Sequence, residues 1–317
     1  HIADAAQRRL RVAMVEDALR RIGKINTSEV AIRSARPLPT TSYRTGVRML
    51  VDSDGALAYR RPRSHVPFRP ASCLIAHPLV DELIGSIRCP GSREVTIRVG
   101  ARTGERMVVV DGDPAAVSAP DDVRISGSNR PDSVSVHEVI HGRRLRISGG
   151  SFFQASPEGA EELIRLVGLA LADVDRSEVV VDAYSGGGLF SATIGSEWAA
   201  QDGRVIAVEV NPIAAADATV NAPHAHSTVA RFEDWDPVSA SAVIADPARP
   251  GLAGPGVKSV VETGAAVVVL VSCDAGALGR DAGLLHESGY TLRDVSVVDM
   301  FNQTSHVEAV SRFERTA

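Results

Sequence analysis

The sequence predicts an α/β protein that contains two kinds of sheet. From about residue 148, apolar strand-like runs alternate with helix-like segments, which is typical of a parallel sheet. Between residues 26 and 147, short alternating segments separated by turn residues predict a mainly antiparallel α+β region. We therefore predict an N-terminal helix (1–25) that docks on the C-terminal domain, a central α+β domain (26–147) and a C-terminal α/β domain (148–317).

Composition places the chain among ordinary globular proteins. It has 317 residues, 44% hydrophobic and 23% charged, and no apolar run approaches the length of a membrane span. Its three cysteines do not make a disulfide framework, so we expect a monomeric protein of the reducing cytoplasm with no membrane partner. The chain opens with His1 rather than methionine, so we expect it to be part of a longer protein.

Charge is unevenly distributed along the chain. The net charge is −5, but residues 1–70 hold 14 basic and six acidic side chains, a net of +8. A basic first quarter fits a polyanionic partner such as nucleic acid. A set of solvated arginines explains the same pattern equally well.

The first two segments have distinct periodicities. Residues 5–22 predict a helix, because Val12, Val15, Leu19 and Ile22 recur at helical spacing. The central region predicts strands at 43–52, 58–61, 95–101, 106–111, 136–140 and 143–147, a helix at 76–87 and a loop at 118–132.

The last segment begins with a predicted helix at 157–172. Strands are predicted at 179–184, 204–210, 226–232, 241–246, 265–272, 291–299 and 306–313. The last two are separated by only residues 300–305, too few for a parallel crossover, so they should form an antiparallel hairpin. Five parallel strands closed by such a hairpin is the Rossmann-like plan of class I S-adenosylmethionine (SAM) methyltransferases.

A glycine turn organises this segment. Val179 to Phe190 reads as a buried strand, three glycines (186–188) and the start of a helix, which is a nucleotide-binding βα unit. Glu209 lies 23 positions after Gly186, near the end of the next strand, where a carboxylate reaches ribose hydroxyls. NAD-binding proteins share this feature. Asp182 before the glycines, and Asp246 followed by proline after a later strand, favour SAM.

Two further residues can carry chemistry. Cys273 follows the apolar run 266–271, so it lies at the ligand edge of a parallel sheet, where a nucleophile is favoured over a buried structural thiol. Glu308 lies among apolar residues of the last strand, where it is either an outward-facing residue or a base with a raised pKa. Gln154 is a polar amide after two aromatic residues.

The motifs resemble those of the RNA 5-methyluridine methyltransferases, the enzymes of the tRNA T-loop and of 23S ribosomal RNA. The resemblance covers most of the chain and is strongest over 145–317. The motifs occur in the family's order: Ser151-Phe-Phe-Gln154, Asp182-Ala-Tyr-Ser-Gly-Gly-Gly-Leu-Phe190, Glu209-Val-Asn211, Asp246-Pro-Ala-Arg-Pro-Gly251, Ser272-Cys-Asp-Ala-Gly-Ala-Leu-Gly-Arg-Asp281 and His306-Val-Glu308.

The resemblance implies a role for each motif. Cys273 matches the nucleophile that adds to C6 of the target uracil, and Glu308 matches the base that removes the C5 proton. Other positions match the SAM-binding residues, namely Gln154, Asp182, Tyr184, Gly186, Gly188, Glu209 and Asp246. The implied partner is RNA, either tRNA or 23S rRNA.

The sequence also departs from the family pattern. Ala248 replaces a proline, Leu189 stands where an asparagine is common, and Ala275 replaces another common proline. The usual N-terminal β-barrel RNA-binding domain is not expected in this sequence. Cys73 resembles the last of four cysteines that hold an iron–sulfur cluster in many members, and we expect no cluster on this chain alone.

Three other functions stay open at this point. A SAM methyltransferase acting on a protein or small molecule would not need Cys273. A non-catalytic RNA-binding relic would not need to retain both Cys273 and Glu308. A dehydrogenase would require a second nucleotide-binding half, which does not follow Glu209 in the expected way.

Overall fold

The structure is a computed structural model that describes residues 2–61, 64 and 66–316. The chain divides into two compact units, one made of residues 1–38 and 159–317 and the other of residues 39–158. The boundaries differ from the predicted ones, because residues 26–38 belong to the first unit and residues 148–158 to the second. The reason for the first difference is a short strand, β1 (Ala31–Ser34), that the sequence did not reveal and that extends the sheet of the first unit.

Within the described residues, the first unit contains an eight-stranded sheet in the order β1-β15-β16-β14-β13-β10-β11-β12. The strands from β14 to β12 are parallel, and β16 pairs antiparallel with both β14 and β15. The predicted plan of five parallel strands closed by a hairpin is therefore confirmed. The strand bounds are β10 (Val179–Ala183), β11 (Arg204–Glu209), β12 (Ala225–Val229), β13 (Ala242–Ala245), β14 (Val267–Ser272), β15 (Tyr290–Val298) and β16 (Glu308–Arg315).

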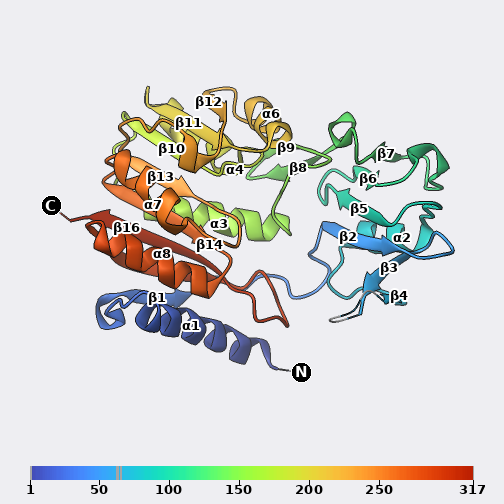
Figure 1. Cartoon of the computed structure of the whole chain (residues 1–317), viewed down its shortest axis with the longest axis horizontal. Helices are drawn as coiled ribbons and strands as arrows, with labels where there is room; N and C mark the ends of the chain where they lie inside the picture. Colours follow the sequence, from blue (N-terminus) through green and yellow to red (C-terminus); the bar gives the residue numbers. More distant parts are fainter. Residues whose placement is uncertain (1, 62–63, 65, 317) are drawn as a thin grey trace. The chain divides into compact units, whose positions relative to one another are not determined.

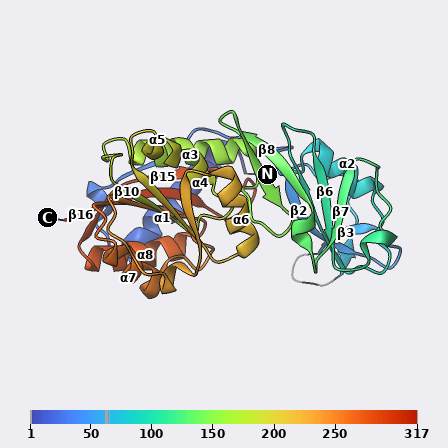
Figure 2. The ribbon, with the colours of Figure 1, turned by 90° about the horizontal axis from the view of Figure 1, so that it is seen from above.

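Helices cover both faces of this sheet. In Figure 2, α3 and α5 lie on one face, and α1, α7 and α8 lie on the other. Figure 1 shows the blue N-terminal segment running alongside the red C-terminal strands, which agrees with the parallel pairing of β1 and β15. The bounds are α1 (Asp4–Arg21), α3 (Pro157–Ala170), α4 (Leu189–Ala192), α5 (Gly195–Ala199), α6 (Pro212–Asn221), α7 (Ala253–Glu262), α8 (Ala275–Glu287), η1 (Thr27–Glu29) and η4 (Phe232–Asp234).

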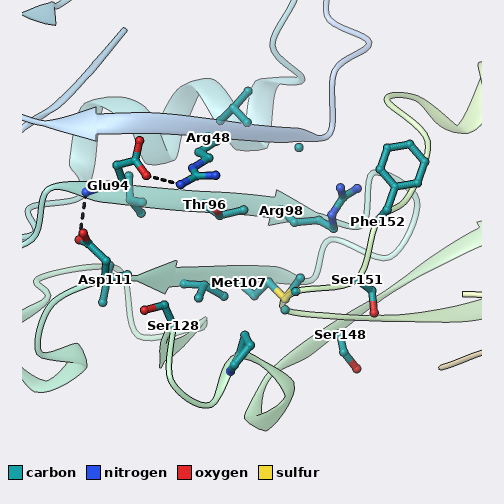
Figure 3. Close-up of a pocket in the computed structure, with 18 residues that line it drawn as sticks. Arg48, Glu94, Thr96, Arg98, Met107, Asp111, Ser128, Ser148, Ser151 and Phe152 are labelled. Carbon is teal, nitrogen blue, oxygen red and sulfur yellow. Dashed lines mark hydrogen bonds and ion pairs between the residues drawn. The ribbon is translucent and has the colours of Figure 1, made fainter. Parts of the chain in front are cut away.

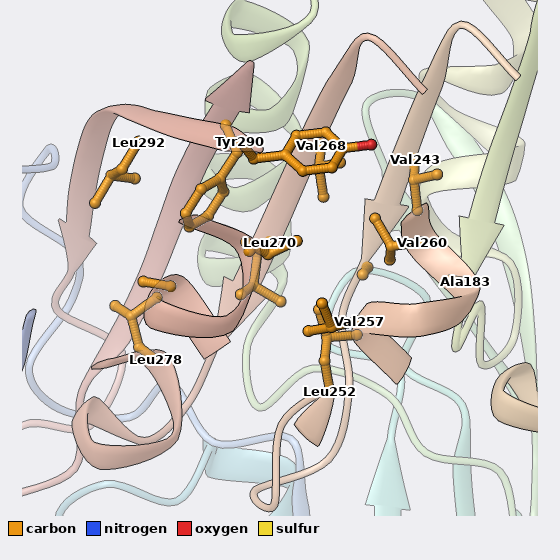
Figure 4. Packing of buried hydrophobic residues seen from close by; sticks show 14 of the residues in the cluster. Ala183, Val243, Leu252, Val257, Val260, Val268, Leu270, Leu278, Tyr290 and Leu292 are labelled. Carbon is orange, nitrogen blue, oxygen red and sulfur yellow. The ribbon is translucent and has the colours of Figure 1, made fainter. Parts of the chain in front are cut away.

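The central strands are buried on both faces, which explains their continuous apolar sequence. All four residues of β13 and all six of β14 are buried. Val268 and Leu270 pack with Leu278 of α8 and Val257 of α7 in one hydrophobic cluster (Figure 4). Each such side chain contributes about 1.5–3 kcal/mol on burial, so the strand ends are held on a rigid scaffold.

In the described part of the second unit, a six-stranded sheet has the order β4-β3-β2-β5-β6-β7, and β8 and β9 form a separate hairpin. The loop predicted at 118–132 was wrong in part, because it contains β7, which pairs parallel with β6. Glycine, proline and serine around this strand hid it. The bounds are β2 (Gly46–Val51), β3 (Leu57–Arg60), β4 (Pro67–Phe68), α2 (Pro78–Ser86), β5 (Glu94–Val99), β6 (Arg106–Val110), η2 (Pro114–Ala116), β7 (Val123–Gly127), η3 (Pro131–Ser133), β8 (Ser135–Ile140) and β9 (Arg143–Ser148).

Among the described helices, none combines the length and the apolar character needed to cross a lipid bilayer.

Candidate active site

The predicted glycine turn joins β10 to α4. Gly188 has a φ of 81°, and a Cβ at this position would lie 3.0 Å from the Cα of Ala218 in α6. Glycine is therefore required both by the left-handed backbone and by the close approach of α6. Asn221, at the end of α6, donates its side-chain amide to the carbonyl of Gly187 at 2.8 Å. The turn is thus held in one shape, with backbone rather than side chains at its surface.

Glu209 ends β11 beside this turn. Its Oε2 accepts the N–H of Gly186 at 2.8 Å, and its Oε1 accepts the N–H of Asn211 at 2.7 Å. A carboxylate has about four lone-pair sites, so each oxygen can accept one more hydrogen bond. The side chain is half-buried, and its orientation is fixed by the backbone of two neighbouring loops.

Asp182 lies inside the strand end rather than on the surface of the turn. It is 1% exposed, and its Oδ2 accepts both the N–H and the hydroxyl of Ser191 in α4. Burial raises its pKa to about 7, and the negative charge of Glu209 adds to this shift. Its Oδ1 has no hydrogen-bond partner among the described residues. Asp182 therefore fastens the start of α4 to the strand.

Tyr184 begins the turn with a left-handed backbone, at a φ of 58°. Its hydroxyl donates to Glu233 of η4 at 2.7 Å, and its ring packs at 5.4 Å from the ring of Phe232. Burial and the hydrogen bond to Glu233 raise the pKa of the phenol, which stays neutral. These contacts connect the glycine turn to the loop after β12.

Cys273 and Glu308 lie at adjacent strand ends. The last pair of β14 and β16 is Ser272 with Ala309, and Cys273 and Glu308 are the residues next to this pair on the two chain segments. The charge of Glu308 contributes to the raised pKa of the Cys273 thiol, so the two side chains lie near each other. Both residues were predicted as reactive, and the fold brings them together at the carboxyl edge of the parallel strands.

The two reactive groups share an environment that disfavours charge. Glu308 is 4% exposed, and burial together with the nearby charge of Asp246 raises its pKa well above the usual value. Burial raises the pKa of the Cys273 thiol to about 11, and the carboxylates of Glu308 and Asp246 contribute in the same direction. The guanidinium of Arg249 acts in the opposite direction. Asp246, Cys273 and Glu308 therefore form one electrostatic cluster.

The loop after β13 is held by α8. Asp281 is fully buried and accepts the N–H of Leu252 at 2.7 Å and the N–H of Ala253 at 3.0 Å. Arg280 donates to the carbonyl of Pro250 in the same loop. These contacts fix the chain just after Asp246 and Arg249.

The loop that leads into Glu308 is held by α1. Arg11 is buried and forms an ion pair with buried Asp299. Its guanidinium also donates to the carbonyls of Phe301 at 2.7 Å and of Thr304 and His306 at 3.3 Å each. One side chain of the N-terminal helix therefore sets the shape of residues 299–306, immediately before Glu308.

Comparisons with known proteins agree with this geometry. No family model matches the chain. A Streptomyces avermitilis protein described as an uncharacterized RNA methyltransferase is 29% identical over 100% of this chain and 79% of its own length. An Enterococcus faecalis protein with the same description is 28% identical over 98% of this chain and 79% of its own length. The chain is therefore similar, along nearly its whole length, to proteins described as RNA methyltransferases.

A solved structure has the same fold as this chain. The Pyrococcus abyssi tRNA (uracil-54, C5)-methyltransferase, solved in complex with S-adenosyl-L-homocysteine, aligns with a TM-score of 0.73. The alignment covers 96% of this chain and 83% of that one, at 22% sequence identity. At this identity the likeness establishes the fold, so the predicted class I SAM methyltransferase fold is confirmed.

The remaining predicted residues of this RNA methyltransferase homologue lie in the second unit. Gln154 is buried there, and its assignment to the cofactor stays a prediction. Cys73 is half-buried before α2, where its N–H donates to Asp81 at 2.8 Å. Within the described residues, no group of three or more His, Cys, Asp or Glu side chains is placed to hold a metal ion.

Sequence reasoning missed four supporting residues of the first unit. Arg11, Asn221, Glu233 and Asp281 each fix a loop of the site from another element. Asp281 ended a quoted motif, but nothing in the sequence indicated what its carboxylate holds. Arg11 was hidden because it is one of five arginines in its helix, and the sequence does not show which of them is buried.

Proposed function

We propose that this protein methylates C5 of a uridine in tRNA or 23S rRNA, with SAM as the methyl donor and a covalent bond between Cys273 and C6. The observation that supports the proposal is that Cys273 and Glu308 lie next to the last pair of β14 and β16, so that a thiol is near a buried carboxyl group. A methyltransferase acting directly on an oxygen, nitrogen or protein side chain needs no such pair.

The cofactor site is assigned to the glycine turn and Glu209. Glu209 is oriented by two backbone N–H groups and has acceptor capacity for ribose hydroxyls, and the turn presents backbone free of side chains. Tyr184, Gly188 and Asp246 lie on the same edge of the sheet, and Asp182 supports the turn from within. Bound SAM supplies the electrophilic methyl group that C5 accepts.

Cys273 and Glu308 perform separate steps. C5 of uracil is a weak nucleophile until C6 is substituted, so Sγ of Cys273 adds to C6, and the electrons of the C5–C6 double bond move to C5 and the O4 carbonyl. After C5 is methylated, Glu308 takes the C5 proton. The double bond re-forms, the bond between Sγ and C6 breaks, and the thiolate leaves.

The raised pKa of Glu308 fits its step, whereas the raised pKa of the thiol must be overcome in the first step. A carboxyl group whose pKa is raised by burial is a stronger base once ionised, as removal of a carbon-bound proton requires. The thiol is almost entirely protonated at neutral pH. Its attack on C6 therefore requires that it lose a proton, and ionised Glu308 and Asp246 oppose that loss.

The proposal is tested by trapping the covalent intermediate. Glu308→Gln should still add the thiol and transfer the methyl group, but the C5 proton cannot leave, so a methylated protein–RNA complex should accumulate. A denaturing gel with labelled RNA and SAM would show it as a band of reduced mobility, and the double variant Glu308→Gln/Cys273→Ala should give no band. If Glu308→Gln yields no Cys273-linked complex and near-normal turnover, the covalent mechanism does not apply to this protein.

A further inference from the structure

The second unit contains a pocket of about 600 Å³ beside its six-stranded sheet. Strands β2, β5 and β6 and the segment 148–152 form its walls. Figure 3 shows Arg98 close to Ser151 and Phe152 at one end of the pocket, and Glu94 and Asp111 at the other. A cavity of this size accommodates a nucleotide.

Most charged side chains around this pocket already have partners. Glu94 accepts from Arg60 at 2.6 Å and also from Arg48. Asp111 accepts the backbone N–H groups of Arg93 and Glu94, as well as the side chain of Arg93 at 3.2 Å. The acidic end is therefore neutralised by the protein itself.

Arg98 differs from these arginines. Its Nη1 is buried and has no hydrogen-bond partner among the described residues. A guanidinium withdrawn from water without a partner is costly, and proteins normally match it with an anion. The pocket itself is where such an anion can enter.

The surroundings of Arg98 increase the positive charge at this end. Burial, and next the nearby charge of Arg44, lowers the pKa of Arg98 to about 10, so Arg98 remains positively charged at neutral pH. The charge of Glu138 acts on Arg98 in the opposite direction and raises its pKa. Glu138 is buried and already accepts the backbone N–H groups of Ala101, Arg102 and Val139.

The backbone makes room for this guanidinium. Gly46 of β2 faces Arg98 across the strand pair, since the two are partners in register. A Cβ at position 46 would lie 2.9 Å from Nη2 of Arg98. The absence of a side chain on Gly46 therefore lets the guanidinium lie flat against β2, at the edge of the pocket.

We propose that this pocket binds a phosphodiester group of the RNA substrate, with Arg98 as its main ligand and Arg44 adding positive charge. The identity of the phosphate as part of RNA rests on the proposed function. The guanidinium donates paired hydrogen bonds to phosphate oxygens, which is the geometry for which arginine is suited. The site is separate from the residues that carry the methyl transfer.

The test compares Arg98→Met with Arg93→Met in the full chain. Arg93→Met removes the same charge as Arg98→Met, but the Arg93 side chain is 89% exposed and is paired with Asp111. Binding of tRNA and 23S rRNA transcripts is measured from 50 to 300 mM salt, together with the melting temperature of each variant. Arg98→Met should weaken binding about tenfold and reduce the salt slope by about 0.7–0.9, the effect of one phosphate contact. Arg93→Met should change the slope by less than half as much.

The melting temperature distinguishes a ligand residue from a structural one. Without RNA, Arg98→Met removes an unpaired charge, so its melting temperature should equal or exceed that of the wild type. A clear fall in melting temperature, or a salt slope equal to that of the wild type, would overturn the proposal.

Two further measurements are needed. One distinguishes a phosphate of RNA from a free phosphate, and the other separates failure of this proposal from failure of the proposed function. If uridine monophosphate or inorganic phosphate protects the wild type but not Arg98→Met, while RNA binding is the same in both, the pocket takes a free anion and the RNA assignment is wrong. Methylation by the wild type is measured separately. Its absence would defeat the proposed function, whereas the salt slopes would still decide whether Arg98 binds RNA phosphate.

Discussion

Glu209 and Glu308 lie at the same edge of one sheet, but their surroundings differ. Glu209 accepts two backbone N–H groups and is half-buried. Glu308 is buried among apolar residues near a second acid, which raises its pKa. The first environment favours a fixed hydrogen-bond acceptor, and the second favours a group that exchanges protons. The edge of the sheet therefore has two halves. The ligand-holding half contains Glu209 and the glycine turn, and the chemical half contains Cys273 and Glu308.

The largest expected effect breaks the chemical half alone. Cys273→Ala should lower methylation by at least about 10⁴-fold, because it removes the group that activates C5. SAM affinity should stay within about twofold, since Glu209 and the glycine turn are unchanged. Single-turnover assays and calorimetry with SAM measure the two quantities. Retained methylation in this variant would favour direct transfer to a nucleophile other than C5.

The pH dependence of kcat/KM tests the role of Cys273 in the chemical half. With the pKa of Cys273 at about 11, the thiolate fraction of the free enzyme rises about tenfold for each pH unit between pH 7 and 10. If this thiolate attacks C6, kcat/KM should rise by up to about 10³-fold over that range. A flat profile, with RNA shown to remain folded, would indicate that bound RNA itself assists loss of the thiol proton.

A smaller effect is expected from the helix that holds the chemical half. Arg11→Met leaves Asp299 buried without its cation, which costs about 3–5 kcal/mol of folding free energy. The double variant Arg11→Met/Asp299→Asn removes that cost but not the loss of the carbonyl contacts to residues 301–306. Its kcat should fall about 100-fold through misplacement of Glu308, with SAM affinity unchanged. Arg20→Met, on the exposed side of α1, is the matched control.

Normal turnover in that double variant would show that β16 alone positions Glu308. Arg11 would then act only in folding, and the loop 299–306 would have no role in catalysis.

The sequence pointed to candidate reactive residues, but not to the residues that hold them in place. The runs of valine predicted the central strands, because burial on both faces restricts those positions to apolar residues. The glycine cluster predicted the turn, because its backbone conformation restricts the choice of residue. Cys273 and Glu308 were proposed from their motifs, and only the structure showed that they lie near each other beside the last pair of β14 and β16. Arg11 and Asp281 were not found, because long-range partners leave no local pattern. Nothing local in the sequence indicated that Arg98 lines a pocket. β1 and β7 were missed because both are short and contain polar residues.

The ligand-holding half is tested by Glu209→Ala. Loss of a charge-assisted hydrogen bond should weaken SAM binding by about 1.5–3 kcal/mol, roughly 10- to 100-fold. The Glu308→Gln variant should bind SAM normally, so the two substitutions separate the halves. Calorimetry at saturating RNA and without RNA measures both. If Glu209→Ala and the wild type bind SAM with equal affinity, Glu209 does not bind the ribose of SAM.

The smallest expected effect concerns Asp182, which supports the turn from inside. Its pKa is about 7 in the folded chain against 3.8 in an unfolded one, so the folded state binds more protons between these values. Stability contributed by protonated Asp182 is complete below pH 4 and is lost as pH rises through 7. Asp182→Asn does not titrate, so its unfolding free energy relative to the wild type should rise from pH 5 to pH 8 by at least about 1.4 kcal/mol, the equivalent of one pKa unit. Ser191→Ala removes a hydrogen-bond donor to ionised Asp182. The unfolding free energy of this variant should therefore fall more between pH 5 and pH 8 than that of the wild type. Urea denaturation at the two pH values measures the differences, and a constant difference between Asp182→Asn and the wild type would mean that Asp182 stays ionised in the folded protein.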